Sequence, residues 1–165
     1  MASELGRNIH QRIGDASGGK WQYQFQVLEG RAPGHAVVSQ IIALIGDDAD
    51  QIEHVEVAVS SARSTHGVSL QVIVWAKSVI LDITAEAGET PITRVIPRRT
   101  LSALTLLSAP IVTIQSVGSD WTPTKVSLVY PALDVTLPID SEERAQSDAV
   151  ALFLPSLLAD LEASY

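Results

Sequence analysis

The sequence contains no cysteine, and this absence excludes several kinds of chemistry. Such a chain forms no disulfide bond, supplies no thiolate ligand to a metal ion and has no cysteine nucleophile. Aromatic residues make up only 5% of the chain, so aliphatic side chains must fill most of the core. No apolar run approaches the roughly 18 residues of a membrane-spanning helix, and no apolar segment of a secretory signal is visible.

Positive charge is scarce as well. The chain has 11 Lys and Arg residues against 19 Asp and Glu residues, which gives a formal net charge of −8. Nucleic acids and anionic membranes attract basic surfaces, so this balance weighs against both as partners. We therefore expect an acidic, cytoplasmic protein that binds no nucleic acid and does not insert into a membrane. Arginine outnumbers lysine, and alanine and valine are abundant, which is typical of a bacterial source.

The main feature present is an alternation of apolar and polar residues, which continues with few breaks from about residue 53 to residue 140. A period of two places alternate side chains on the two faces of a sheet. The turns between the runs are too short for crossover helices, so neighbouring strands are expected to be antiparallel. The predicted strands are 53–61, 68–76, 79–85, 92–97, 101–107, 111–117, 124–130 and 133–139.

Two segments have helical periodicity instead. The first, 33–45, begins at Pro33 and is followed by Gly46, and these residues suit the two ends of a helix. The second runs from about 141 to 163, and Pro155 inside it predicts a kink or a split into two helices. Its apolar stripe consists of Val150, Phe153, Leu154, Leu157, Leu158 and Leu161.

With 165 residues, of which 46% are hydrophobic, the chain is long enough for one well-buried core. We predict a single α+β domain over 21–165. Its fold is expected to be a curved antiparallel sheet or a partly open β-barrel closed by a C-terminal helix, with an N-terminal strand–helix unit. Residues 1–20 are polar and glycine-rich and are expected to form a flexible N-terminal arm, or a short helix followed by a loop.

The segment 21–27 alternates aromatic or aliphatic residues with glutamines, which predicts a strand. One interpretation is an ordinary strand whose aromatic face packs on the core. The other is an edge strand for self-association, or a stacking surface for a ligand. The predicted partner or ligand surface consists of Trp21, Tyr23, Phe25, Trp75 and Trp121.

Arg94, Arg98 and Arg99 form the densest basic cluster of the chain. Three guanidinium groups around Pro97 could contact an anion, and they could equally pair with the many carboxylates of the same chain. Both interpretations stay open from the sequence.

No motif supplies a complete set of catalytic or metal-binding residues. The stretch Gly14–Lys20 fits part of a phosphate-binding loop, but Trp21 stands where that motif needs Ser or Thr. The four histidines have no ligand spacing, and the acidic turn 47–53 lacks the glycine and the final glutamate of a calcium loop. We therefore predict no cofactor, no metal and no catalytic residue, and we favour a binding protein over an enzyme.

The run from Val68 to Tyr165 resembles bacterial pleckstrin-homology-like and GRAM-type domains. The matching pieces are Val68–Trp75, the hairpin through Lys77 into Val79–Thr84, the segment Thr93–Leu101, three short strands and a final helix. The resemblance implies an antiparallel barrel closed by its last helix. It also implies a non-catalytic binding module that interacts with a protein partner or with a second copy of itself.

The order strand, helix, antiparallel sheet and long C-terminal helix is also similar to that of helix-grip (START-like) domains. This second resemblance rests on the segments 21–27, 33–45, 53–139 and 141–163. It implies an apolar small ligand held between the sheet and the last helix, and an enzymatic role is compatible with it.

Overall fold

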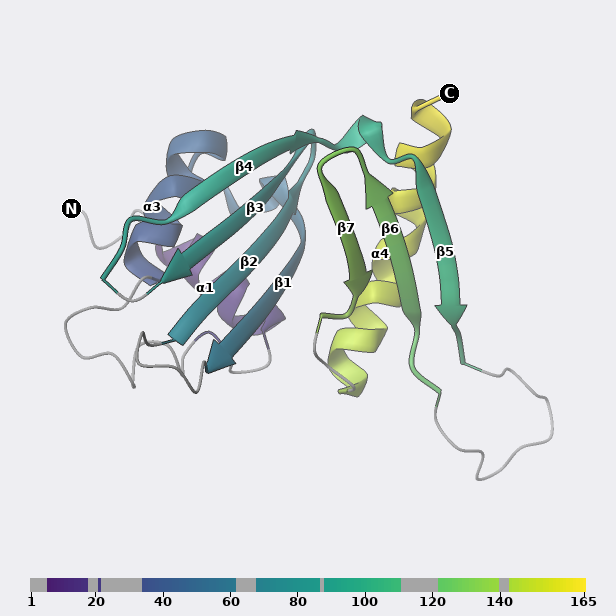
Figure 1. Ribbon diagram of the computed structural model, residues 1–165, viewed down its shortest axis with the longest axis horizontal. Coiled ribbons are helices and arrows are strands. Elements are labelled where there is room, and N and C mark those ends of the chain that lie inside the picture. The colour runs from purple at the N-terminus through teal and green to yellow at the C-terminus, as the bar shows by residue number, and fades with distance from the viewer. Residues whose placement is uncertain are drawn as a thin grey trace. The chain divides into compact units, whose positions relative to one another are not determined.

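The computed structural model describes residues 6–17, 21, 34–61, 68–86, 88–110, 122–139 and 143–165. The chain forms two compact units, Met1–Arg98 and Arg99–Tyr165, and each has its own antiparallel sheet (Figure 1). The predicted α+β class with antiparallel strands and a C-terminal helix is confirmed. Two compact units can belong to one folding domain, so the single domain expected for 21–165 stays a prediction.

The first unit is built on a four-stranded sheet with the strand order β1–β2–β3–β4. Its three strand pairs are antiparallel, and short turns connect β2 to β3 and β3 to β4. The strands are β1 (Ile52–Ser61), β2 (Val68–Ala76), β3 (Val79–Glu86) and β4 (Ile92–Pro97). Each strand lies within one residue of its predicted range, because turn signals bound the alternation at both ends.

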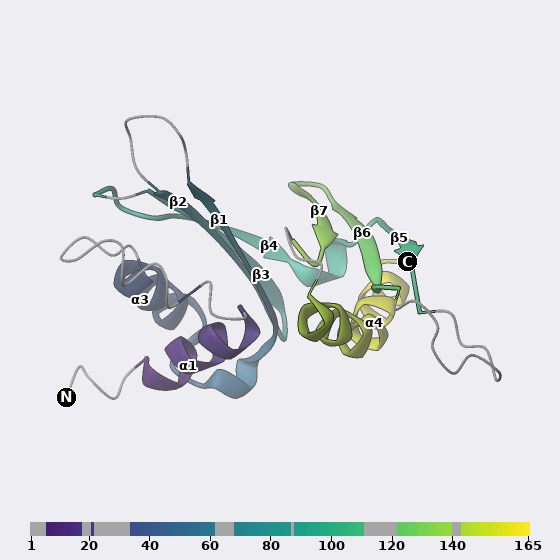
Figure 2. The ribbon, with the colours of Figure 1, turned by 90° about the horizontal axis from the view of Figure 1, so that it is seen from below.

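Two helices, α1 (Arg7–Ala16) and α3 (Gly34–Ile45), lie on the same face of this sheet (Figure 2). They supply buried side chains to a core that β1, β2 and β3 complete with alternate residues. Burial of these aliphatic groups is the main stabilising term of the unit. Members of the core include Ile9, Ile13, Val37, Ile41, Val55, Val57, Leu70, Val72, Leu81 and Ile83.

Part of the predicted N-terminal arm is helical. Residues 7–16 form α1, and Ile9 and Ile13 are both 0% exposed in the core of the first unit. Of the two expectations for 1–20, the short helix is therefore the one that the structure shows at 7–16. The backbone of Trp21 is helical, so the predicted strand 21–27 does not begin at that residue, and 22–27 lie outside the described residues.

The second unit has a three-stranded sheet with the order β5–β6–β7 and one long helix, α4 (Arg144–Ala163). Its strands are β5 (Ala103–Ser108), β6 (Lys125–Tyr130) and β7 (Leu133–Leu137). In both views α4 lies along one face of this sheet (Figures 1 and 2). The predicted strand 111–117 lies outside the described residues.

Alternation along β6 and β7 explains which face α4 covers. Val126, Leu128 and Leu137 are 0% exposed, whereas Val129 and Asp134, which point to the other face, are exposed. From the helix, the buried apolar residues are Val150, Phe153 and Leu157. We infer that these two sets of side chains form the core of the second unit.

Helix α4 continues through Pro155 as one element of 20 residues. The predicted split into two helices therefore does not occur. Pro155 lies on the exposed side of α4, where water can hydrogen-bond the carbonyl group that the proline leaves without a donor. Among the described residues, no helix combines the length and the apolar character needed to cross a membrane.

Candidate functional site

Two of the aromatic residues predicted for a partner or ligand surface are interior side chains. Trp21 and Trp75 are both 0% exposed. The rings of Trp75 and His54 lie 5.6 Å apart between centroids. An enclosed indole ring cannot contact a partner, so neither tryptophan belongs to an exposed surface as predicted. Tyr23, Phe25 and Trp121 lie outside the described residues.

Trp21 is held by two hydrogen bonds. Its backbone N–H donates to Ser17 Oγ (3.1 Å), and its indole Nε1–H donates to His10 Nδ1 (3.0 Å). An indole N–H can only donate, so His10 must accept at Nδ1 and is neutral in this arrangement. Burial lowers the pKa of His10 below its ordinary value, and the positive charge of a protonated His35 lowers it further.

The lowered pKa of His10 predicts a loss of stability in acid. The unfolded chain takes up the proton near the ordinary value of 6.5, whereas the folded chain takes it up only at lower pH. The contribution of neutral His10 is therefore complete above pH 6.5 and is lost as the pH falls toward the pKa of the folded state. Urea unfolding midpoints measured above and below pH 6.5 check this expectation.

His10→Gln is the matched variant, because its amide oxygen accepts the indole N–H and does not titrate. We expect the unfolding midpoint of this variant to depend less on pH than that of the parent chain. Equal pH dependence in the two proteins would contradict the role given to His10.

The three arginines predicted as possible anion contacts have different surroundings. Arg94 Nε donates to Asp82 Oδ2 (3.0 Å), and Arg94 Nη2 bonds the same oxygen. Arg98 is only 2% exposed and pairs with Glu53 Oε2 at 2.8 Å, whereas Arg99 is exposed. For Arg94 and Arg98 the structure thus shows pairing with carboxylates of the first unit, which is one of the two interpretations left open by the sequence.

A β-bulge brings Glu53 to Arg98. The β1–β2 register shifts between Ile52 and His54, so Glu53 is an extra residue in the strand. Such a residue is released from the regular alternation and its side chain is re-aimed. Arg98 also donates from Nη1 to the carbonyl oxygen of Ala76 (3.0 Å), so its guanidinium group ties the start of β1 to the end of β2.

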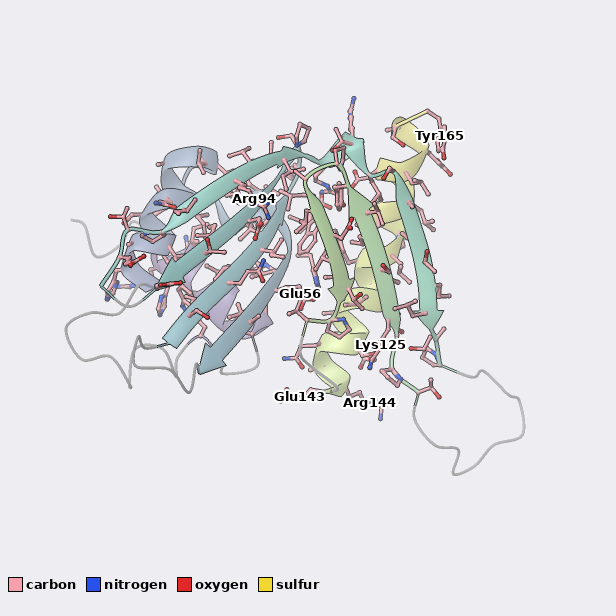
Figure 3. All side chains as sticks on the ribbon, in the orientation of Figure 1. Glu56, Arg94, Lys125, Glu143, Arg144 and Tyr165 are labelled. Carbon is pink, nitrogen blue, oxygen red and sulfur yellow. The ribbon has the colours of Figure 1, made fainter. Side chains whose placement is uncertain are left out.

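The face of the four-stranded sheet that α1 and α3 do not cover has polar groups in one cross-strand row. In this row Glu56, Ile73, Asp82 and Arg94 follow each other in register from β1 to β4. Figure 3 labels its two ends, Glu56 and Arg94. Glu56 is 4% exposed and Asp82 is 1% exposed. Two enclosed carboxylates on one sheet face are the strongest candidate for catalytic chemistry in the first unit.

Each carboxylate of this row already has side-chain partners. Glu56 Oε1 lies 2.7 Å from His54 Nε2, and Asp82 Oδ1 accepts from Gln71 Nε2 (2.9 Å) in addition to the bonds from Arg94. The two carboxylates belong to β1 and β3, which two strand spacings of about 4.8 Å separate. Acid–base catalysis needs an acid and a base aimed at one shared space. Here the carboxylates of Glu56 and Asp82 are each hydrogen-bonded to side chains of the same sheet, which is the usual condition of an enclosed structural network.

An open depression of about 360 Å³ lies between α1 and η1 (Ala49–Gln51). Asp48 caps η1, since its Oδ1 accepts the Asp50 N–H (2.9 Å) and its Oδ2 accepts from Gln51 Nε2 (3.2 Å). The hydrogen bond from the Asp50 backbone is the larger cause of a lowered pKa of Asp48, and the bond from the Gln51 side chain lowers this pKa further. The lining residues are Asn8, Gln11, Arg12, Asp15, Asp48, Ala49 and Asp50.

Within the described part of the chain, no cluster of three or more His, Asp or Glu side chains could bind a metal ion.

The outward side of α4 has exposed apolar side chains. Leu152 is 83% exposed and Leu158 is 49% exposed. Ala151, Pro155 and Ala159 lie between them along the helix surface and are exposed too. We call these five residues the outer stripe. No charged residue occurs from 149 to 159, a run of about three helical turns that contains the whole outer stripe.

The sequence identified only part of this feature. Leu158 belonged to the predicted core stripe of the helix, although it is half exposed, and Leu152 was in neither a predicted core nor a predicted surface. The available signal was the charge-free run 149–159, in which Ser156 is the only polar residue. A surface helix that packs on one sheet normally has polar residues on its other side.

Comparison with known proteins gives no assignment: no family model, no curated protein and no solved structure matches the chain. The resemblances to pleckstrin-homology-like, GRAM-type and helix-grip domains therefore stay predictions.

Proposed function

We propose that the chain is a non-catalytic protein-interaction or assembly module and that the outer stripe of α4 is its contact surface. The exposure of Leu152 and Leu158 on a charge-free helix segment carries this proposal. Exposed apolar side chains gathered on one face typically mark a site of protein–protein contact. A protein partner is favoured over a nucleic acid because the chain carries a net charge of −8.

The non-catalytic part of the proposal rests on the polar row of the first unit. Its carboxylates, Glu56 and Asp82, bond to side chains of the same sheet and so have a structural role. In the second unit, Leu128 of the sheet and Val150 and Leu157 of the helix are 0% exposed, as in an ordinary packed core. An apolar ligand between sheet and helix is the alternative function, and no specific observation favours it.

Site-specific photo-crosslinking in cells that produce the chain tests the proposal. A photoreactive amino acid replaces Leu152 in one experiment, and Leu44 in a second. Leu44 is the control because it is an exposed leucine (48%) on α3, in the other unit. We expect crosslinked products of discrete mass from position 152 and none from position 44.

The same experiment includes Leu158→Asp as a second change in the chain labelled at position 152. This substitution places a charge in the outer stripe while leaving the buried residues of α4 unchanged, so the crosslinked product should disappear. Crosslinking from position 152 at the level of position 44, or a product that survives Leu158→Asp, would overturn the proposal.

A further inference from the structure

The contact between His10 and Trp21 joins a titrating acceptor to an enclosed donor. Trp21 Nε1–H donates to His10 Nδ1 over 3.0 Å, and the two rings meet edge to face with their centroids 5.7 Å apart. Trp21 is 0% exposed in the core of the first unit, whereas His10 is partly exposed. Water therefore reaches the imidazole but not the indole, and a proton can bind at this contact before the unit unfolds.

The geometry of the contact suits only the neutral imidazole. In the imidazolium ion both ring nitrogens carry a proton, so protonation sets an N–H of His10 against the N–H of Trp21. If the imidazolium ring instead turned toward water, the indole N–H would stay enclosed and lose His10 as its acceptor, which is unfavourable in an apolar core. An indole that turns into solvent avoids both costs, because water accepts its N–H.

The charges on the same side of α1 also favour neutral His10. Burial is the larger cause of the lowered pKa of His10, and the positive charge of a protonated His35 on α3 is the second. Arg7, one turn earlier on α1, is another cation on this side of the helix. A proton on His10 in the closed contact therefore has cationic neighbours.

The other charged groups of the elements that pack on α1 have different places. On β1, Glu53 is held in an ion pair at the start of the strand, and the pair His54–Glu56 belongs to the sheet face that α1 and α3 do not cover. Three carboxylates line the depression between α1 and η1, which is on the opposite side of α1 by the helical periodicity: Asp15, Asp48 and Asp50.

We propose that His10 is a pH-sensitive switch: protonation of its imidazole releases the indole of Trp21 from the core of the first unit into solvent. A ligand that binds an open arrangement more tightly than a closed one shifts the population toward the open one, and here the ligand is a proton. Helix α1 stays in place, because Ile9 and Ile13 are buried in the core. The bond from the Trp21 backbone N–H to Ser17 Oγ fixes the main chain but not the side-chain torsions. The switch does not depend on the proposed function of the outer stripe.

The indole N–H signals in a proton–nitrogen correlation NMR spectrum of the full chain test the switch. The chain has three tryptophans, and the signal that disappears in Trp21→Phe is that of Trp21. A neutral, soluble paramagnetic agent broadens the signals of N–H groups that reach solvent. We expect the Trp21 signal to be protected above pH 6.5 and to broaden several-fold as the pH falls below this value, while the far-UV circular dichroism stays unchanged.

His10→Gln and His10→Asn are the matched controls, because each amide oxygen accepts the indole N–H and does not titrate. In either variant, the Trp21 signal should stay protected at every pH at which the chain is folded. A parent signal that stays protected until circular dichroism reports global unfolding would overturn the inference. Equal broadening in acid of the parent and of a folded His10 variant would overturn it as well, because a different group would then control the exposure of Trp21.

Discussion

Replacing Arg94 by methionine is expected to lower the free energy of unfolding by about 3 kcal/mol, although the arginine side chain is largely exposed. The cost comes from its partner, because Asp82 is 1% exposed and would be left with the neutral Gln71 as its hydrogen-bond partner. An enclosed carboxylate that loses its cation is destabilised far more than an exposed one. Urea unfolding followed by circular dichroism measures the difference.

The control for this prediction is the double variant Arg94→Met/Asp82→Asn. The asparagine removes the enclosed charge and keeps a group that can bond Gln71, so most of the lost stability should return. If Arg94 and Asp82 instead formed an ordinary surface pair, Arg94→Met would change the free energy of unfolding by less than about 1 kcal/mol. That result would contradict the structural role assigned to the pair.

Much of the sheet could be predicted because its signals are local. The turn residues that separate β2, β3 and β4 act within a few positions, and the period of two along each strand needs no distant partner. For the same reason, the antiparallel pairing of these strands followed from the short connections alone. The division into a four-stranded and a three-stranded sheet depends on which strands pair, which the alternation does not encode.

The roles of the polar and aromatic residues could not be predicted, because they depend on residues far apart in the chain. Asp82 has outward parity on β3, yet its carboxylate is enclosed and bonded to Arg94, twelve residues later. Glu53 reaches Arg98 only because of a bulge, and a bulge leaves no clear mark in a sequence. Trp21 is the first residue of the alternating segment 21–27, which predicts a strand, but its backbone is helical and its indole contacts His10.

The outer stripe of α4 is an intermediate case. The absence of charge from 149 to 159 is visible in the sequence. It does not indicate a surface until the structure shows that Val150, Phe153 and Leu157 are the buried apolar residues of α4. The apolar content of this helix exceeds what one face needs, and the proposed contact surface rests on that excess.

The second large effect is expected at Trp21. Truncation by Trp21→Ala should lower the free energy of unfolding by about 4 kcal/mol, because it leaves a cavity among aliphatic side chains and removes the partner of His10. Trp21→Phe keeps most of the buried ring and loses only the indole donor, so it should cost less, about 1–2 kcal/mol. Chemical unfolding of the two variants gives both values.

This pair of variants decides between the core and the surface interpretations of Trp21. A tryptophan on an exposed partner surface would tolerate either substitution with a change of less than about 0.5 kcal/mol. Tyr165, which is 98% exposed, supplies the matched control, since Tyr165→Ala should fall in that range. If Trp21→Ala behaves as Tyr165→Ala does, the indole is not part of the core and the predicted surface at the N-terminal segment regains its first member. If it instead costs several kcal/mol, α1 and Trp21 belong to the core of the first unit. Trp21 is then excluded as a partner surface, and the outer stripe of α4 stays the proposed one.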